Sequence, residues 1–180
     1  HSFLYDGQDW TALDYPAGSE TYAMGIDGSK IVGHYKSGTG RRGFLYDETS
    51  NSWTSLNYPG ARETFAFGIH AGSIVGYYDI AGAHHGFMYD GDNWITIDYP
   101  NAVRTHVRGI LDNTVVGSYD DAQGKTHGFT FDGQNWIIRD YPGAQYTYFW
   151  RTDGTRIVGS YYDCSNHYHG FIYDGQNYTT

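Results

Sequence analysis

The chain of 180 residues has little of what would place it in several common protein classes. It has one cysteine, Cys164, so it forms no disulfide within the chain and no cysteine-based metal cluster. It has four prolines and no apolar run long enough for a membrane-spanning helix. Its 11 basic residues against 20 acidic ones give a formal charge of −9. This charge argues against nucleic acid and anionic membrane surfaces as partners, because both attract basic proteins.

Aromatic residues are abundant, although the mean hydropathy is only −0.58. They make up 18% of the chain, and 25 glycines accompany them. A disordered chain is poor in aromatic residues. The composition therefore indicates a folded protein of many short strands and tight turns.

One pattern of about ten residues recurs five times. In HGFTFDGQNW, from His127, an Asp-Gly turn separates two short apolar runs, as in a tight β-hairpin. The copies are 41, 43, 42 and 42 residues apart and are anchored by Phe3, Phe44, Phe87, Phe129 and Phe171. A fixed period in this range is typical of solenoids, propellers and repeat arrays.

A second pattern alternates with the first. Residues 21–26 and 31–35 form one copy, Thr-Tyr-Ala-Met-Gly-Ile followed by Ile-Val-Gly-His-Tyr, and related pairs follow in the next three periods. Each period thus holds four candidate strands. We expect a single domain, 1–180, with an outer hairpin at 1–16 and repeats at about 21–58, 64–99, 105–141 and 147–180.

Four antiparallel strands in about 42 residues match one blade of a β-propeller. The expected fold is an all-β propeller of four blades, with five blades as an alternative and an open β-solenoid as the second architecture. The extra outer hairpin either closes the ring, begins a fifth blade or pairs with another chain to give a homo-oligomer.

Two resemblances extend this expectation. The Asp-Gly-x-x-Trp hairpin resembles the Asp-box hairpin of sialidase-type propellers, which implies that Thr-x-Ala-x-Gly-Ile is the innermost strand. The alternating HGFLYDG-like and IVG-like segments resemble the repeats of bacterial extracellular HAF proteins over essentially the whole chain. That resemblance implies a secreted or cell-surface location and brings no catalytic residues with it.

The repeats also separate folding residues from candidate functional ones. Residues that recur in most copies, such as the tryptophans at 10, 53, 94 and 136 and the histidines at 1, 85, 127 and 169 (Arg42 in the remaining copy), are assigned to folding. Departures from the pattern cluster in the inner strands. One column holds Tyr22, Phe65, His106 and Tyr148, a second holds Met24, Phe67, Arg108 and Trp150, and Arg151 replaces a repeat glycine. We predict that these nine residues line one asymmetric pocket at the propeller axis.

A saccharide or similar polar small molecule is the expected ligand, because aromatic faces pack on sugar C–H groups and Arg and His supply hydrogen bonds. A lyase or cyclase is an alternative, with His106 or His34 as base, Tyr22 or Tyr148 as acid, and Arg108 or Arg151 neutralising an anion. A structural or protein-binding scaffold is a third. No cofactor motif is present, and the loop aspartates at 79, 120, 121 and 163 recur with the repeat, so no metal site is predicted.

Overall fold

The computed structural model describes all residues, 1–180, and consists of eighteen β-strands joined by turns. The first two strands, β1 (Ser2–Tyr5) and β2 (Trp10–Leu13), form a hairpin. Two antiparallel four-stranded sheets and one eight-stranded sheet follow in chain order. The eight-stranded sheet consists of two antiparallel four-stranded units joined by a single parallel bridge, and we name the four units blades 1 to 4. The all-β fold predicted from the repeats is therefore confirmed.

Each blade runs from an inner to an outer strand in sequence order. Blade 1 consists of β3 (Thr21–Asp27), β4 (Lys30–Ser37), β5 (Gly40–Asp47) and β6 (Ser52–Leu56). Blade 2 consists of β7 (Glu63–His70), β8 (Ser73–Ile80), β9 (Ala83–Tyr89) and β10 (Trp94–Thr96). Blade 3 consists of β11 (Arg104–Leu111), β12 (Thr114–Asp120), β13 (Thr126–Phe131) and β14 (Trp136–Arg139). Blade 4 consists of β15 (Tyr146–Thr152), β16 (Ile157–Tyr162), β17 (Tyr168–Tyr173) and β18 (Tyr178–Thr179).

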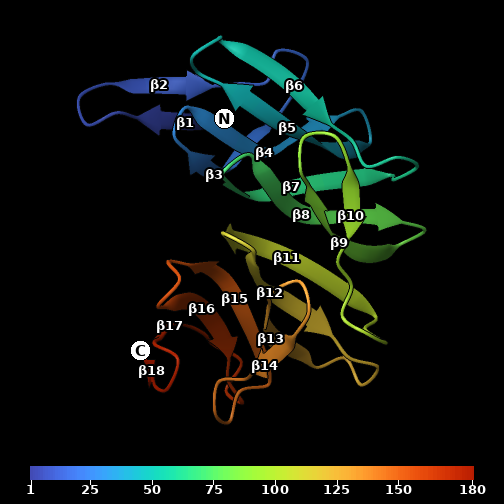
Figure 1. Ribbon diagram of the computed structural model, residues 1–180, viewed down its shortest axis with the longest axis vertical. Helices are drawn as coiled ribbons and strands as arrows, with labels where there is room; N and C mark the ends of the chain where they lie inside the picture. Colours follow the sequence, from blue (N-terminus) through green and yellow to red (C-terminus); the bar gives the residue numbers. More distant parts are fainter.

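The blades follow one another around a common centre, with the β1–β2 hairpin at one end of the series and blade 4 at the other (Figure 1). The inner strands β3, β7, β11 and β15 lie next to one another in this order. One parallel bridge, between Thr126 and Tyr146, links blades 3 and 4. No strand pairing joins blade 4 to the hairpin or to blade 1.

Apolar side chains between the blades form the core. Val32 of blade 1 packs with Ala66, Ile74 and Phe87 of blade 2, and the pattern is repeated between the later blades. Phe87 is fully buried and lies over Gly76 of the adjacent strand; a Cβ on Gly76 would come within 2.9 Å of the Phe87 ring. The same Cβ would come within 1.9 Å of Phe65 O on the inner strand. The glycine of the repeated Ile-Val-Gly segment is therefore required first by this carbonyl and then by the anchoring phenylalanine.

The two ends of the series expose positions that are covered elsewhere. Val158 of blade 4 is 44% exposed, whereas its repeat equivalent Val116 is fully buried. Phe3 of the hairpin is 64% exposed, whereas its equivalent Phe44 is fully buried. The stacking of one blade on the next, rather than the blade alone, thus buries the apolar residues.

Candidate functional site

Every inner strand carries a β-bulge at the same repeat position. The register with the neighbouring strand shifts there, and the bulged residues are Met24, Phe67, Arg108 and Trp150. A bulge takes one residue out of the hydrogen-bond ladder, which leaves its carbonyl group free for another partner. The second column of sequence departures therefore coincides with the bulges.

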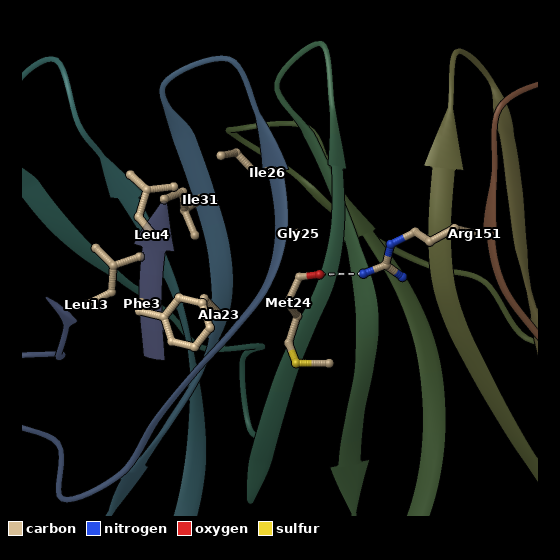
Figure 2. A pocket seen from close by; sticks show the side chains of 9 residues that line it. All are labelled: Phe3, Leu4, Leu13, Ala23, Met24, Gly25, Ile26, Ile31 and Arg151. Carbon is tan, nitrogen blue, oxygen red and sulfur yellow. Dashed lines mark hydrogen bonds between the residues drawn. The ribbon is translucent and has the colours of Figure 1, made fainter. Parts of the chain in front are cut away.

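The carbonyl oxygens of these four bulged residues all accept hydrogen bonds from Arg151. Nη2 donates to Met24 O at 2.6 Å and to Phe67 O at 2.7 Å, while Nη1 donates to the carbonyl oxygens of Arg108 and Trp150. Figure 2 shows the guanidinium pointing at the Met24 carbonyl. One side chain thus contacts the inner strands of all four blades at the axis.

The space for this side chain exists only in blade 4. In blades 1 to 3 a glycine stands at the position of Arg151, because the bulge carbonyl of the next blade lies against it. A Cβ on Gly25 would come within 2.7 Å of Phe67 O, and one on Gly109 within 3.0 Å of Trp150 O. No further blade approaches residue 151. Both terminal nitrogens of Arg151 donate to carbonyl oxygens within the protein, so this side chain fills the axis.

Rings from the first column of departures form a belt between successive blades. Tyr22 stacks on His34 with ring centres 5.0 Å apart, and His34 meets the edge of Phe65 at 5.0 Å. Phe65 stacks on Tyr77 at 4.6 Å, and Tyr77 meets His106 at 4.6 Å. These residues pack mainly on one another, so the belt holds the blades together beside the axis.

The two buried histidines of the belt are neutral at ordinary pH. Burial lowers the pKa of His34 to about 4, and burial with the nearby Arg108 charge lowers the pKa of His106 to about 2. The His106 Nε2 lies 2.8 Å from His84 Nδ1 in a hydrogen bond between imidazoles. A general base works best with a pKa near the working pH, and these two groups are far below it.

Arg108 lies at the side of the axis and lines a pocket of about 320 Å³ with Tyr148, Trp150, Ser160 and Tyr168. Its guanidinium carbon lies 4.4 Å from the centre of the Trp150 ring, over its face. The Trp150 Nε1–H donates to Ser160 Oγ at 2.9 Å, which fixes the indole. This pocket combines flat aromatic surface, hydroxyl groups and one cation.

The nine predicted residues are only partly brought together. Arg108, Tyr148 and Trp150 line the pocket, while Phe67, 5.6 Å from the Arg108 guanidinium, and His106 adjoin it. The other four lie elsewhere: Tyr22 and Phe65 in the belt, Met24 in the groove described below, and Arg151 at the axis.

Ser160 and Tyr168 complete the pocket and are absent from the sequence prediction. A signal for Tyr168 exists in the repeats, because its position holds four different residues: Arg41, His84, Thr126 and Tyr168. Ser160 shares a column with His34, Tyr77 and Ser118. Extending the comparison of copies to the second and third strands of each blade would have found both.

The repeated histidines make the hydrogen bonds expected of folding residues. His85 Nδ1 contacts Asp98 Oδ2 at 2.7 Å, and His127 Nδ1 contacts Asp140 Oδ2 at 2.8 Å, each across a β-hairpin. The repeated Trp94 packs against Tyr58, Phe87 and Tyr89 between blades. These contacts are of the kind that the assignment to folding predicts.

A second groove, of about 320 Å³, lies between the β1–β2 hairpin and blade 1 (Figure 2). Leu4, Leu13, Ala23 and Ile31 line it, and Arg151 is its only charged residue. Between complete blades, a valine such as Val32 occupies the corresponding space. The groove is therefore an unfilled packing position with few polar groups for a hydroxylated ligand.

Two further observations bear on ligands and location. No group of three or more His, Cys, Asp or Glu side chains is arranged to hold a metal ion. The chain also forms no helix with the length and apolar character needed to cross a membrane.

Comparison with known proteins identifies the fold and no family. No family model and no curated protein matches the chain. Among solved structures, TolB from Acinetobacter baumannii superposes with a TM-score of 0.69 at 15% identity, covering 87% of this chain and 41% of TolB. The β-propeller domain of the Trilobed protease from Pyrococcus furiosus gives 0.63 at 14% identity, covering 90% and 51%.

The lectin of Aleuria aurantia, described as a six-bladed β-propeller, gives a TM-score of 0.50 at 15% identity, covering 89% of this chain and 58% of the lectin. The chain thus spans about half the length of these propellers. At such low identity the similarity shows the fold alone. The chain is a β-propeller by architecture.

Proposed function

We propose that this chain is a carbohydrate-binding, lectin-like propeller module whose site is the pocket of Arg108, Tyr148, Trp150, Ser160 and Tyr168. The observation that carries the proposal is the position of Arg108 over the Trp150 face beside the two tyrosines and the serine. The aromatic faces would pack on the C–H groups of a sugar ring. The hydroxyl and guanidinium groups would hydrogen-bond to the sugar hydroxyls.

Binding is favoured over catalysis by the state of the histidines. The enzyme alternative needs His106 or His34 as a base. The pKa of His106 is lowered to about 2 and that of His34 to about 4. Such weak bases take up little of a substrate proton near neutral pH. The Aleuria aurantia lectin, a propeller of similar fold, has been solved as an N224Q mutant in complex with alpha-methyl-L-fucoside.

The finer architecture belongs to the same proposal. We infer a ring built from four blades. The four four-stranded units support this inference, as does Arg151, which contacts one carbonyl of each inner strand. The repeat resemblance to HAF proteins supports a secreted or cell-surface location. The exposed Phe3 and the unpaired edge of β1 support the hairpin as a contact between copies.

A glycan array followed by calorimetry tests the site. We expect the parent to bind at least one class of saccharide, and Trp150→Ala to lose that binding with little change in melting temperature. Trp10→Ala, at an exposed repeat tryptophan in the hairpin, is the matched control and should bind like the parent. Binding that survives in Trp150→Ala and disappears in Trp94→Ala would move the site to the repeated outer positions and overturn the proposal.

A further inference from the structure

Arg108 is a half-buried cation with no carboxylate within ion-pair distance. The other bulged positions, Met24, Phe67 and Trp150, hold uncharged residues, so the fold does not require a charge here. The Arg108 side chain makes no hydrogen bond and no ion pair, and its Nε is buried without a partner. An unpaired charge removed from water lowers stability, which is why buried charges in proteins are normally paired.

Several other arginines of this chain are paired, although the exposed Arg139 and the half-buried Arg42 form no ion pair. Arg62, Arg104 and Arg156 each lie within 4.0 Å of an aspartate carboxylate. Arg151, only a few residues from the same pocket, has its two terminal nitrogens bonded to four carbonyl oxygens. Arg108 therefore differs from Arg151, whose terminal nitrogens all donate hydrogen bonds within the protein.

The surroundings of Arg108 hold its charge without using its donors. Trp150 lies 4.4 Å from the guanidinium and Phe67 lies 5.6 Å from it, and the π faces of these rings attract a cation. Ring faces accept no strong hydrogen bond, so the N–H groups stay available. The Asp120 carboxylate acts on Arg108 only from beyond ion-pair distance, and the nearby His106 is neutral and offers no counter-charge.

We propose that the saccharide bound in this pocket carries an anionic group, a carboxylate or a sulfate, which pairs with Arg108. This inference rests on the proposed function and specifies the ligand class of the same site. A guanidinium matches a carboxylate or sulfate because two parallel N–H donors meet two oxygens. Trp150 and Tyr148 then contact the sugar ring, and Arg108 selects its charge.

The test compares matched ligands and matched variants by calorimetry. The ligands are an oligogalacturonide, the same oligomer with its carboxyl groups methyl-esterified, and a sulfated oligosaccharide of similar length. The parent should bind the ester at least about tenfold more weakly than the free acid. Arg108→Met, which introduces the residue found at position 24, should bring this ratio to about one, while Arg156→Met at an exposed ion pair should leave it unchanged. Stronger binding of the sulfated oligosaccharide, lost equally in Arg108→Met, identifies the anion as sulfate and supports the inference.

Thermal melting separates this role from a structural one. Without ligand, Arg108→Met should melt at the parent temperature or above it, because it removes an unpaired, half-buried charge. A clear fall in its melting temperature would show that Arg108 is satisfied within the protein and would overturn the inference.

The two proposals fail in different ways. If the acid and the ester bind equally well and Arg108→Met changes neither, the anionic ligand is excluded, while loss of binding in Trp150→Ala still supports a saccharide site. If no acidic, sulfated or neutral saccharide binds the parent, both proposals are overturned.

Discussion

The guanidinium of Arg151 donates a hydrogen bond of 2.6 Å to the carbonyl oxygen of Met24, a residue 127 positions earlier in the chain. This bond crosses the axis from the last blade to the first. With the bonds to Phe67, Arg108 and Trp150, it makes one side chain the common partner of all four inner strands.

Replacing Arg151 with glycine, the residue of the other three copies, should therefore destabilise the protein. Four carbonyl groups lose a charged donor, and we expect a loss of about 2–4 kcal/mol in the free energy of unfolding. Urea denaturation measures it. Arg156→Gly, at an exposed turn, is the control for a lost arginine. An Arg151→Gly protein as stable as the parent would show that water satisfies the carbonyls equally well.

Two repeat tryptophans should differ in their effect on stability. Trp94 packs against Tyr58, Phe87 and Tyr89 between blades, whereas Trp10 is 65% exposed on the hairpin. We expect Trp94→Ala to cost about 3 kcal/mol. Trp10→Ala should cost much less. Equal changes in the two melting temperatures would contradict the burial-based argument.

Two repeat glycines give a similar comparison of backbone packing. A Cβ on Gly86 would lie 2.3 Å from Ile97 O and 2.7 Å from Val107, whereas one on Gly170 meets nothing within 4 Å. Gly86→Ala should therefore lower the melting temperature strongly, and Gly170→Ala should leave it nearly unchanged. A large effect at Gly170 would mean that its face is covered in solution, for example by another copy of the chain.

Stability should fall in mildly acidic solution because of His34 and His106. Their folded-state pKa values, about 4 and about 2, lie below the ordinary value of 6.5, so the unfolded chain binds more protons once the pH falls below about 6.5. The contribution of the two neutral histidines to the free energy of unfolding is fully present above that pH. It decreases as the pH falls towards their folded-state pKa values. At about pH 5 the loss should be about 2 kcal/mol for each histidine.

Urea denaturation at about pH 7 and about pH 5 measures this difference. His34→Tyr, which introduces the residue at Tyr77 of the same column, should reduce the difference by about half. His167→Gln, at an exposed loop histidine, should leave it intact. Identical pH dependence in all three proteins would show that His34 does not resist protonation in the folded state.

The sequence predicts the fold well because the repeats encode it several times over. The Ile-Val-Gly glycine recurs in all four blades and the Asp-Gly turn in four of the five outer hairpins, each for a local reason, so the strands and their order can be predicted without coordinates. Phe3 is the exception, because a phenylalanine that recurs in every copy is exposed here, where no neighbouring blade covers it. Burial at such a position depends on the next blade and cannot be read from the copy itself.

The site is predicted less completely. Comparing the copies finds Arg108, Tyr148 and Trp150, because these residues break the pattern at the axis. The same comparison groups Arg151 with them, although the Arg151 guanidinium donates to the carbonyl oxygens of the four bulged residues. The difference depends on the β-bulges, which turn four carbonyl groups to the axis and have no signature in side-chain alternation.

The long sequence separation of the Arg151 hydrogen bonds bears on the order in which parts of the molecule fold. Hairpins and blades form from residues close in sequence, so their loop-closure entropy is small. The bonds from Arg151 to Phe67 and Met24 span 84 and 127 residues, and they have correct geometry only after all four inner strands are in place. We therefore expect these bonds to form late, after the rate-limiting step. Their loss in Arg151→Gly should accelerate unfolding and leave the refolding rate nearly unchanged, so this arginine governs how long the folded molecule persists rather than how fast it is reached.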